Sequence, residues 1–242
     1  MELANTAAIV TGAASGLGAA TAAALTAAGA TVHGFDLADF SGVRVDVTDP
    51  DAVREAVEVA ASGPEPLRVV VNCAGIAPSA RILGRAGVHD LAMYAKVVQV
   101  NLIGTFNVMA LAAERMAATA PDAHGQRGVI VNTASVAAYE GQIGQAAYAS
   151  SKGGIVGLTL PAARDLAQHG IRVMTIAPGI MLTPMLETVS EEYRTGLAAG
   201  VPFPARLGTP AEYAALALSI VANDYLNGEV IRLDGALRMA PR

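Results

Sequence analysis

The chain has 242 residues, of which 53% are hydrophobic, 15% are charged and 4% are aromatic. That length suits one large α/β domain with a substantial buried core. The net charge is −5 and no basic run is present, so nucleic acid is not expected as a partner. Cys73 is the single cysteine, which excludes an intrachain disulfide.

Neither the N-terminus nor the histidines predict export, a membrane anchor or a metal site. The N-terminal residues MELANTAAIVTG carry no basic stretch and no signal-peptide cleavage site, and no uninterrupted apolar run approaches the ~18 residues of a membrane span. The chain is therefore expected to be cytoplasmic, without a membrane partner. No metal is expected, because four histidines share no ligand-like spacing and lie outside every motif: His33, His89, His124 and His169.

Apolar runs alternate with helical patterns along the chain. Short Val- and Ile-rich runs predict strands at residues 7–11, 31–36, 43–46, 68–72, 129–134, 172–177 and 230–234. Helical patterns lie between them at residues 17–28, 51–61, 89–118, 148–169 and 210–221. Continuous apolar strands between helices indicate a parallel sheet covered on both faces, so we expect a single doubly wound α/β domain with seven strands.

One connection in this pattern is too short to contain a helix. Only six residues separate the strand that ends at Asp36 from the strand that begins at Val43. A helical crossover needs at least ~10–12 residues. Six extended residues reach roughly 20 Å, which is enough for a bare return across the sheet. We predict that the crossover between the second and third strands lacks its helix.

A glycine-rich turn follows the first strand and opens the first helix. Its sequence is TGAASGLG, which contains Gly12, Ser15, Gly16, Leu17 and Gly18. Glycines allow a tight turn and the close approach of a pyrophosphate, and the helix N-terminus offers free N–H groups and a positive dipole end. A purely structural turn is the alternative, but the strand before and the helix after favour a dinucleotide-binding loop.

Two acidic residues end the second and third strands. Asp36 stands where a carboxylate accepts hydrogen bonds from an adenosine ribose diol and repels a 2′-phosphate, which favours NAD over NADP. The alternative is a solvated loop acid, which describes Asp39 better. Asp46 and Val47 follow the third strand, where the carboxylate can accept from an adenine amino group. Taken alone, Asp46 is a helix N-terminal acid, and Asp49 fills that role better.

The fourth strand ends in four small or polar residues: Asn72, Cys73, Ala74 and Gly75. Small residues at this position let a cofactor lie against the backbone where the order of the strands reverses. Cys73 is interpreted as a small buried residue rather than as a reactive thiol.

Tyr148 and Lys152 lie four residues apart, and Ser135 lies thirteen residues before the tyrosine. Lys152 is one of only two lysines in the chain. Residues at i and i+4 share a helix face, so an ammonium beside the phenol is expected to lower its pKa from ~10 toward working pH. Ser135 would orient a substrate oxygen. Such pairs also occur on solvated helix faces, so the acid/base interpretation depends on the motifs around it.

Taken in chain order, these motifs resemble those of the classical short-chain dehydrogenases/reductases. They cover the whole chain and occur in the order of that family: TGxxxGxG, Asn-x-Ala-Gly, Ser135, Tyr148-x-x-x-Lys152 and Pro178-Gly179. The resemblance implies a Rossmann-type fold and an oxidoreductase with a nicotinamide dinucleotide. It also implies that Tyr148 and Lys152 contact the cofactor, and that Pro178 and Gly179 lie beside it.

Further roles follow from the same resemblance. Asn101 matches the asparagine that holds a water of the proton relay, which completes a catalytic set with Ser135, Tyr148 and Lys152. Thr183 matches the residue that hydrogen-bonds the nicotinamide carboxamide. Met181 falls where members of the family line the edge of the nicotinamide.

One branch of the family is matched more closely. From Gly125 to Met239 the chain resembles the type 2 3-hydroxyacyl-CoA dehydrogenases, also called 17β-hydroxysteroid dehydrogenases type 10. The resemblance implies NAD-dependent, reversible oxidation of a 3-hydroxyacyl-CoA by a homotetramer. The alternatives are a dehydrogenase of steroids or other hydrophobic alcohols, a 3-oxoacyl reductase, or a dinucleotide-binding scaffold with little catalysis.

The substrate side of the molecule is less well defined by the sequence. Arg81 and Arg85 lie in a segment that matches the family poorly, where they could meet CoA phosphates or equally be solvated loop charges. Gln145, about one turn before Tyr148, is expected to touch substrate. Residues 181–197 fit either a mobile lid or a fixed amphipathic helix. We expect residues 1–135 mainly to bind cofactor and residues 135–242 mainly to carry catalysis and substrate binding.

Overall fold

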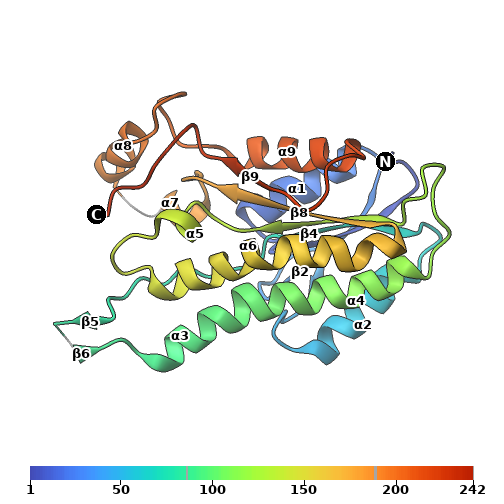
Figure 1. Ribbon diagram of the computed structural model, residues 1–242, viewed down its shortest axis with the longest axis horizontal. Helices are drawn as coiled ribbons and strands as arrows, with labels where there is room; N and C mark the ends of the chain where they lie inside the picture. The colour runs from blue at the N-terminus through green and yellow to red at the C-terminus, as the bar shows by residue number, and fades with distance from the viewer. Residues whose placement is uncertain (86, 188–189, 242) are drawn as a thin grey trace.

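Seven parallel strands form the central sheet of the computed structural model, which describes residues 1–85, 87–187 and 190–241 (Figure 1). The strands are paired in the order β3-β2-β1-β4-β7-β8-β9, and every pair is parallel. This confirms the expected doubly wound Rossmann-type sheet. The strands are β1 (Ala7–Thr11), β2 (Thr31–Asp36), β3 (Val43–Arg44), β4 (Leu67–Asn72), β7 (Gly128–Thr133), β8 (Ile171–Pro178) and β9 (Val230–Leu233).

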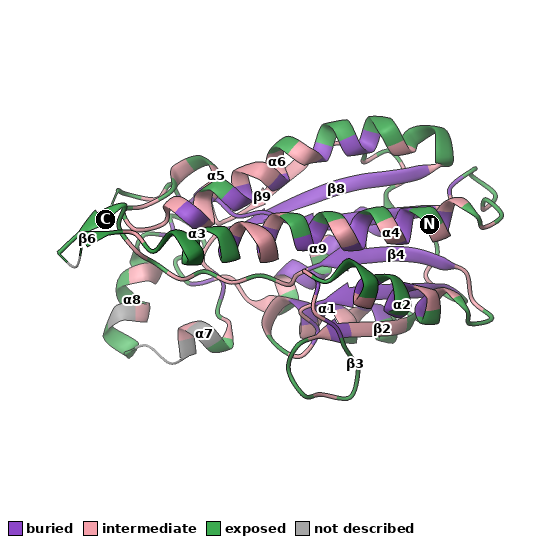
Figure 2. Cartoon of the chain, turned by 90° about the horizontal axis from the view of Figure 1, so that it is seen from below, coloured by how far each residue is buried: buried purple, intermediate pink, exposed green. Residues whose placement is uncertain are grey.

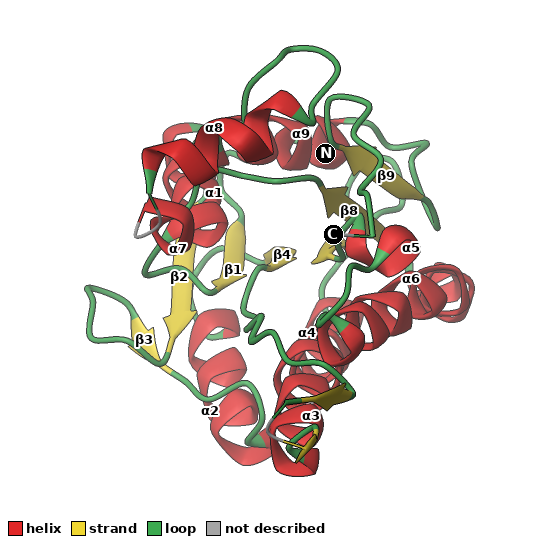
Figure 3. Cartoon of the chain, turned by 90° about the vertical axis from the view of Figure 1, so that its left-hand side faces the viewer, coloured by secondary structure: helices red, strands yellow, loops and turns green. Residues whose placement is uncertain are grey.

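Helices cover both faces of this sheet (Figure 3). One face carries α1 (Gly16–Ala27) and α9 (Pro210–Ala222), which pack against each other. The other face carries α2 (Pro50–Ala61), the continuous helix α3–η1–α4 and α6, and both of these longer helices are described below. Both faces are covered because the strands carry apolar side chains on both faces, as the sequence indicated.

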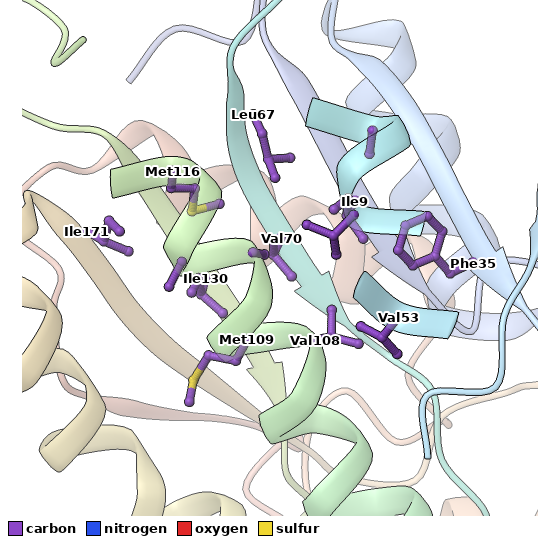
Figure 4. Close-up of a cluster of buried hydrophobic side chains, with 14 of the residues drawn as sticks. Ile9, Phe35, Val53, Leu67, Val70, Val108, Met109, Met116, Ile130 and Ile171 are labelled. Carbon is purple, nitrogen blue, oxygen red and sulfur yellow. The ribbon is translucent and has the colours of Figure 1, made fainter. Parts of the chain in front are cut away.

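Alternating side chains of the central strands build two separate cores. Val70 points into the core shared with α2 and α4, whereas Val69 and Val71 point into the core shared with α1 and α9. All three are fully buried. Figure 4 shows the first core, in which Phe35 and Val53 lie beside Ile9 and Val70. The resulting rigid sheet holds the ends of its strands in fixed positions.

The crossover between β2 and β3 contains no helix, as predicted. Residues 37–42 form bends only. The third strand is shorter than the expected 43–46. The Val45 N–H still donates to the Asp36 carbonyl of β2 at 2.9 Å, and the chain then turns away from the sheet. The carboxylate of Asp46 makes this turn by accepting from the backbone N–H and the hydroxyl of Thr48, at 2.9 and 2.7 Å.

Two helices begin at well-formed caps. Asp49 accepts from the N–H groups of the first turn of α2, which confirms it as the N-terminal acid of that helix. Thr209 and Glu212 form a reciprocal capping box at the start of α9. Both helices carry a proline at their first position, Pro50 and Pro210, where no N–H is needed.

The expected helix at 89–118 consists of α3 (Leu91–Val98), a π-helical turn η1 (Gln99–Gly104) and α4 (Thr105–Ala117). By length and composition alone this run, Leu91–Ala117, could cross a membrane, although polar and charged residues interrupt its apolar sequence. Half of its most apolar window is buried inside the protein, and buried and exposed turns alternate along it (Figure 2). In this fold it serves as a core helix that covers one face of the sheet.

The second long helix and several short elements complete the fold. Helix α6 (Ala146–Leu166) continues into the 3₁₀ turn η2 (Ala167–His169). A small hairpin projects beyond α3, formed by β5 (Leu83–Gly84) and β6 (Gly87–Val88) (Figure 1). The sequence did not predict this hairpin or the short helix α5 (Ala137–Glu140). Two further short helices, α7 (Pro184–Glu187) and α8 (Glu191–Ala199), occupy the segment for which a mobile lid or one fixed amphipathic helix was expected.

Candidate active site

A cavity of about 420 Å³ opens at the carboxyl ends of β1, β2 and β4. This is the point where the order of the strands reverses, because β1 has β2 on one side and β4 on the other. Most of the residues expected to bind cofactor meet here: Gly12, Ser15, Gly16, Leu17, Gly18, Asp36, Asp46, Val47, Cys73, Ala74, Gly75 and Thr183. We call this cavity the nucleotide cleft.

The glycine turn fits a pyrophosphate on two independent observations. Gly12 has a φ of +68°, and a Cβ there would lie 2.9 Å from Ala74 N, so only glycine lets the turn approach the end of β4. A Cβ on Gly18 would lie 2.1 Å from the carbonyl oxygen of Gly12. The first turn of α1 contains no acidic residue, and it lines the cleft with its positive end.

Asp36 ties the end of β2 to the glycine turn. Its carboxylate accepts from the Ala14 N–H at 3.0 Å and from the Ala38 N–H at 2.9 Å. The side chain is partly exposed and lines the cleft, so it retains lone pairs for a bound ribose. Arg44 is its register partner on β3, but Arg44 is not among the residues that line the cleft.

Two residues of opposite charge, Asp46 and Lys96, line the far end of the cleft, and the sequence did not predict that Lys96 would lie there. The pKa of Asp46 is lowered, chiefly by its hydrogen bonds from Thr48 and to a smaller extent by the charge of Lys96. Lys96, the second of the two lysines, is exposed and also lines the cleft. Val47 is buried, and its carbonyl accepts from Asn107 at 3.0 Å. Only the packing of α3 across this end brings Lys96 here.

Thr11, the first residue of the glycine-rich motif, was given no role of its own in the sequence analysis. Its buried hydroxyl accepts from the N–H groups of Cys73 and Ala74, both at 3.1 Å. This clamps the end of β4 to the glycine turn. Burial raises the pKa of the Cys73 thiol, which agrees with its interpretation as a filler rather than a nucleophile.

A second cavity, of about 270 Å³, adjoins the nucleotide cleft and shares Leu17, Cys73, Gly75, Ile76 and Thr183 with it. We call it the substrate cavity. Three catalytic candidates, Ser135, Tyr148 and Lys152, line it together with Gln145, Pro178, Gly179 and Met181. The structure therefore brings residues from the end of β7, the start of α6 and the end of β8 to one place.

The expected lowering of the Tyr148 pKa by Lys152 is wrong for the protein chain alone. Burial raises the pKa of Tyr148 above its ordinary value, and a hydrogen bond from Ser135 opposes this only in part. The Lys152 Nζ lies 5.8 Å from the centre of the phenol ring and donates instead to the Thr133 carbonyl at 2.7 Å. The sequence spacing predicted the shared helix face but not the loss of solvation that dominates at this depth.

Lys152 is held in a buried network behind the cavity. Burial lowers its pKa from 10.5 to about 8. The residue that accepts its hydrogen bond, Thr133, contacts the phenol oxygen of Tyr213 through its own hydroxyl at 2.7 Å. Tyr213 comes from α9 and is fully buried. Sequence motifs carry no signal for it, since its place in the network depends on α9 packing against the sheet.

Asn101 lies in the π-helical turn and is fully buried. Its amide nitrogen donates to the Ile76 carbonyl at 2.9 Å and to the Ser151 hydroxyl at 3.0 Å, and its oxygen accepts from the Ile76 N–H at 2.8 Å. A Cβ on Gly75 would lie 3.2 Å from Asn101 Oδ1 and 3.6 Å from Lys152 Nζ. The absence of a side chain at Gly75 thus leaves space between the two catalytic candidates. Single π turns are frequent at functional sites.

The remaining candidates differ in how firmly the fold positions them. Gly179 donates to the Leu233 carbonyl at 2.9 Å, and Met181 is buried in a bridge with Gly208. Gln145 accepts from the Gln142 N–H at 3.0 Å, which fixes its amide at the start of α6. In contrast, Arg81 and Arg85 are exposed and are not among the residues that line either cavity.

Two other expectations concern metals and the segment 181–197. In residues 1–85, 87–187 and 190–241, no group of three or more His, Cys, Asp or Glu side chains could hold a metal ion. The segment forms α7 and α8, and Leu186 of α7 lines the substrate cavity. Residues 188–189 of the expected lid lie outside the described residues.

Known proteins match this chain along nearly its whole length. The family model described as short chain dehydrogenase matches residues 6–194. The 3-hydroxyacyl-CoA dehydrogenase type-2 of Bos taurus is 53% identical over 97% of this chain and 95% of that protein. The protein of the same name from Drosophila melanogaster is 50% identical over 98% of this chain and 99% of its own length.

A solved structure gives the same result in three dimensions. The crystal structure of 3-hydroxyacyl-CoA dehydrogenase type-2 from Mycobacterium avium superposes with a TM-score of 0.93 and 45% sequence identity, over 98% of each chain. The agreement confirms the expected fold and its topology.

Proposed function

This chain belongs to the short-chain dehydrogenase family, and from that premise we propose that it interconverts 3-hydroxyacyl-CoA and 3-oxoacyl-CoA with NAD. Membership makes it an oxidoreductase of alcohols and ketones that uses a nicotinamide dinucleotide. The observation that carries the finer proposal is the joining of two cavities. Ser135, Tyr148 and Lys152 line one cavity, and the glycine turn lines the other, with five residues common to both.

The chain's own side chains suit the handling of one proton at a secondary alcohol. Tyr148 would take the hydroxyl proton, while Ser135 would bind the substrate oxygen. Lys152 would hold the nicotinamide ribose, and Asn101 would support the proton relay. A bound dinucleotide supplies the hydride acceptor. Because burial raises the pKa of Tyr148, its phenol is a proton donor in the reducing direction at neutral pH.

The choice of NAD over NADP rests on Asp36. Its carboxylate is fixed at the end of β2 by two backbone N–H groups and lines the nucleotide cleft. An anion held there disfavours a 2′-phosphate by charge repulsion and accepts hydrogen bonds from a ribose diol. Residues 1–135 would then form most of the cofactor site, and residues 135–242 most of the substrate site.

The test is a turnover assay. Purified protein with acetoacetyl-CoA and NADH should lose absorbance at the nicotinamide band, and Tyr148→Phe should abolish that loss. Activity that survives Tyr148→Phe would contradict the proposed proton transfer. Tight NADH binding without turnover of any ketone would favour a dinucleotide-binding scaffold instead.

The apolar lining of the substrate cavity supports a second candidate, a dehydrogenase of steroids or other hydrophobic alcohols. Four apolar side chains line this cavity, and they offer no polar group that would select a thioester: Val136, Ile180, Met181 and Leu186. Comparison of turnover with CoA thioesters, free ketones and steroids, each with NAD and NADP, would decide between the two. A preference for NADPH would point to a 3-oxoacyl reductase.

Self-association into a homotetramer is supported by apolar side chains on the outer face of the long helices. Leu91, Ile103, Phe106 and Leu160 are 75, 40, 49 and 45% exposed. A surface of this kind marks interfaces more often than free solvent contact. Light scattering should give a mass four times the 24.5 kDa of one chain. We also propose that the protein resides in the cytoplasm, which cell fractionation would test.

A further inference from the structure

Among the residues that line the substrate cavity, Met239 lies farthest along the sequence. This side chain lines the same cavity as Ser135, Gln145 and Tyr148, although it lies near the end of the chain. The segment that carries it leaves β9 and returns to α5 (Figure 3), where the Met239 N–H donates to Glu140. Leu186 of α7 lines the cavity as well, so two flexible apolar side chains face the substrate space.

A cluster of four charged side chains holds the segment in place. The Arg232 guanidinium forms a two-pronged pair with Glu140 at 2.9 and 3.2 Å, and its Nε donates to Asp234 at 2.6 Å. Arg238 also pairs with Asp234, at 3.2 Å. The side chains of Arg232, Glu140 and Asp234 are only 23, 21 and 8% exposed, so this cluster is better shielded than an ordinary surface pair.

Glu140 also holds the backbone of the cavity wall. Its Oε2 accepts from the N–H of Met239 at 3.0 Å. Arg232 donates through Nη2 to the carbonyl of Leu237 at 3.0 Å, so the backbone at Leu237 and at Met239 is tied to the same ion pair. Beyond it, the Gln142 amide donates to the Ala240 carbonyl at 2.9 Å. The loop after α5 and the C-terminal segment therefore form one unit.

The chemistry of this wall fits the tail of an acyl group. A thioether and branched aliphatic side chains suit methylene groups, whereas the charged part of a CoA thioester needs solvent or cations. The ion pairs of the cluster are satisfied among themselves and offer no free charge to the cavity. Met239 is therefore one of the apolar side chains that an acyl chain in this cavity would meet.

We propose that Met239 is a specificity-determining residue that limits the length of the acyl chain, and that Glu140 and Arg232 are positioning residues that hold it there. This inference rests on the proposed reaction with acyl thioesters. It predicts that the chemistry at the carbonyl is unaffected by changes in this wall, while the preference among chain lengths is altered.

The test compares kcat/KM for 3-oxoacyl-CoA substrates of four and twelve carbons. Met239→Ala should raise the twelve-to-four ratio by about tenfold, since even one further methylene accommodated in an apolar pocket is worth about that much. Met239→Phe should lower the ratio. Equal ratios in the wild type and both variants would overturn the proposal.

Methyl ketones of matching length separate this inference from the proposed function. If thioesters are not turned over but ketones are, the proposed substrate class fails, and the ketone ratios still test the wall. If neither is reduced, dissociation constants from the change in NADH fluorescence give the same ratio without turnover. A ratio that Met239→Ala leaves unchanged in every series rejects the role of Met239.

Glu140→Gln tests the positioning role. This variant should move the chain-length ratio in the same direction as Met239→Ala, with kcat for the four-carbon substrate retained, because Met239 is still present but less firmly held. Arg232→Lys, which keeps the charge but loses the two-pronged pair, should act alike. Glu114→Gln is the matched control, since it removes an exposed pair with Arg54 at 3.0 Å on α4 and α2. An equal fall for all chain lengths in Glu140→Gln would indicate a merely structural role.

Discussion

The nucleotide cleft and the substrate cavity lie side by side but are built from different materials. The cleft is formed at the ends of strands that are fixed in a buried sheet, and two of its glycines, Gly12 and Gly18, leave no room for a Cβ. The cavity is formed by side chains from distant segments, such as Ser135, Leu186 and Met239. A change in the cleft should therefore strongly weaken binding of the dinucleotide. A change in the cavity wall should instead alter the preference among substrates.

The largest effect is expected for Gly18→Ala in the cleft. The added Cβ would lie 2.1 Å from the carbonyl oxygen of Gly12, so the glycine turn must move. A displacement of about 1 Å can cost ~100-fold, and NADH affinity should fall at least that far. Titration of NADH fluorescence measures it.

Gly157→Ala in α6 is the matched control, because a Cβ there meets no atom within 4 Å among the described residues. It should leave NADH binding unchanged and stabilise the helix by up to ~1 kcal/mol. Unaltered NADH affinity in Gly18→Ala would show that the turn is more adaptable than its geometry indicates.

Lys152→Met should lower kcat/KM by ~10²–10⁴-fold, the range of a lost acid/base partner. It should also change how stability depends on pH. The pKa of Lys152 is lowered to about 8 by burial, from 10.5, so between these values the unfolded chain binds more protons than the folded chain. The free energy of unfolding of the wild type should therefore rise through that window, with a Lys152 contribution of at most roughly 1.4 kcal/mol per pH unit.

Below pH about 8 both states of Lys152 hold the proton, so its contribution to the pH slope disappears there. Urea unfolding of wild type and Lys152→Met from pH 7 to 10 isolates the term as the difference between two curves. Parallel curves would mean that the ammonium is better solvated than its burial indicates.

Asp36→Ala should weaken NAD binding by ~10-fold, the effect of losing one hydrogen bond to a charged group. It should also reduce the discrimination against NADP, because the repelling charge is gone. Asp39→Ala is the control, since this exposed acid lies nearby but does not line the cleft. The ratio of kcat/KM for the two cofactors is the measurement, and an unchanged ratio would contradict the role of Asp36.

The smallest effect is expected for Tyr213→Phe, which acts on the cavity from behind. Loss of the hydroxyl leaves Thr133 without its 2.7 Å partner and loosens the carbonyl that holds Lys152. We expect a fall in kcat of about fivefold, which corresponds to ~1 kcal/mol, and a shift in the pH profile of kcat.

Thr175→Val removes a comparable buried hydroxyl, 2.7 Å from that of Thr159, with no bond to Lys152. It should cost similar stability without a shift in the pH profile. A profile shifted equally by both variants would assign the effect of Tyr213→Phe to general loosening of the core.

The strands and long helices were predictable because their signals are local. Runs such as 68–72 and 129–134 each contain three consecutive Val or Ile residues, which predicted a cover on both faces. The observed strands β4 and β7 are buried at every position and differ from the predicted runs by one residue at one or both ends. The missing helix between β2 and β3 followed from chain length alone. The short helix α5 and the hairpin at β5 and β6 were missed, because segments of two to four residues carry little periodicity. For the segment of α7 and α8, the sequence left a mobile lid and a fixed amphipathic helix as alternatives.

For the candidate site as well, some features were predictable from local sequence and others were not. The roles of Gly12, Asp36, Tyr148 and Lys152 stay predictions to be tested, but their meeting around adjoining cavities followed from motif order and the topology of a doubly wound sheet. The direction of the Tyr148 pKa shift did not follow. It depends on how much solvent the surrounding helices remove, and no spacing along the chain contains that quantity.

By itself, the sequence determined the sheet and the family and predicted which residues gather at the nucleotide cleft, because each depends on short-range patterns that act through backbone geometry. Only the tertiary structure decided that Lys96 reaches the nucleotide cleft, that Tyr213 and Lys152 both bond to Thr133 and that Met239 lines the substrate cavity. These residues come from elements distant in the chain. Their positions are set by how helices and the C-terminal segment pack on the sheet, a long-range balance of burial and charge pairing that local sequence does not encode.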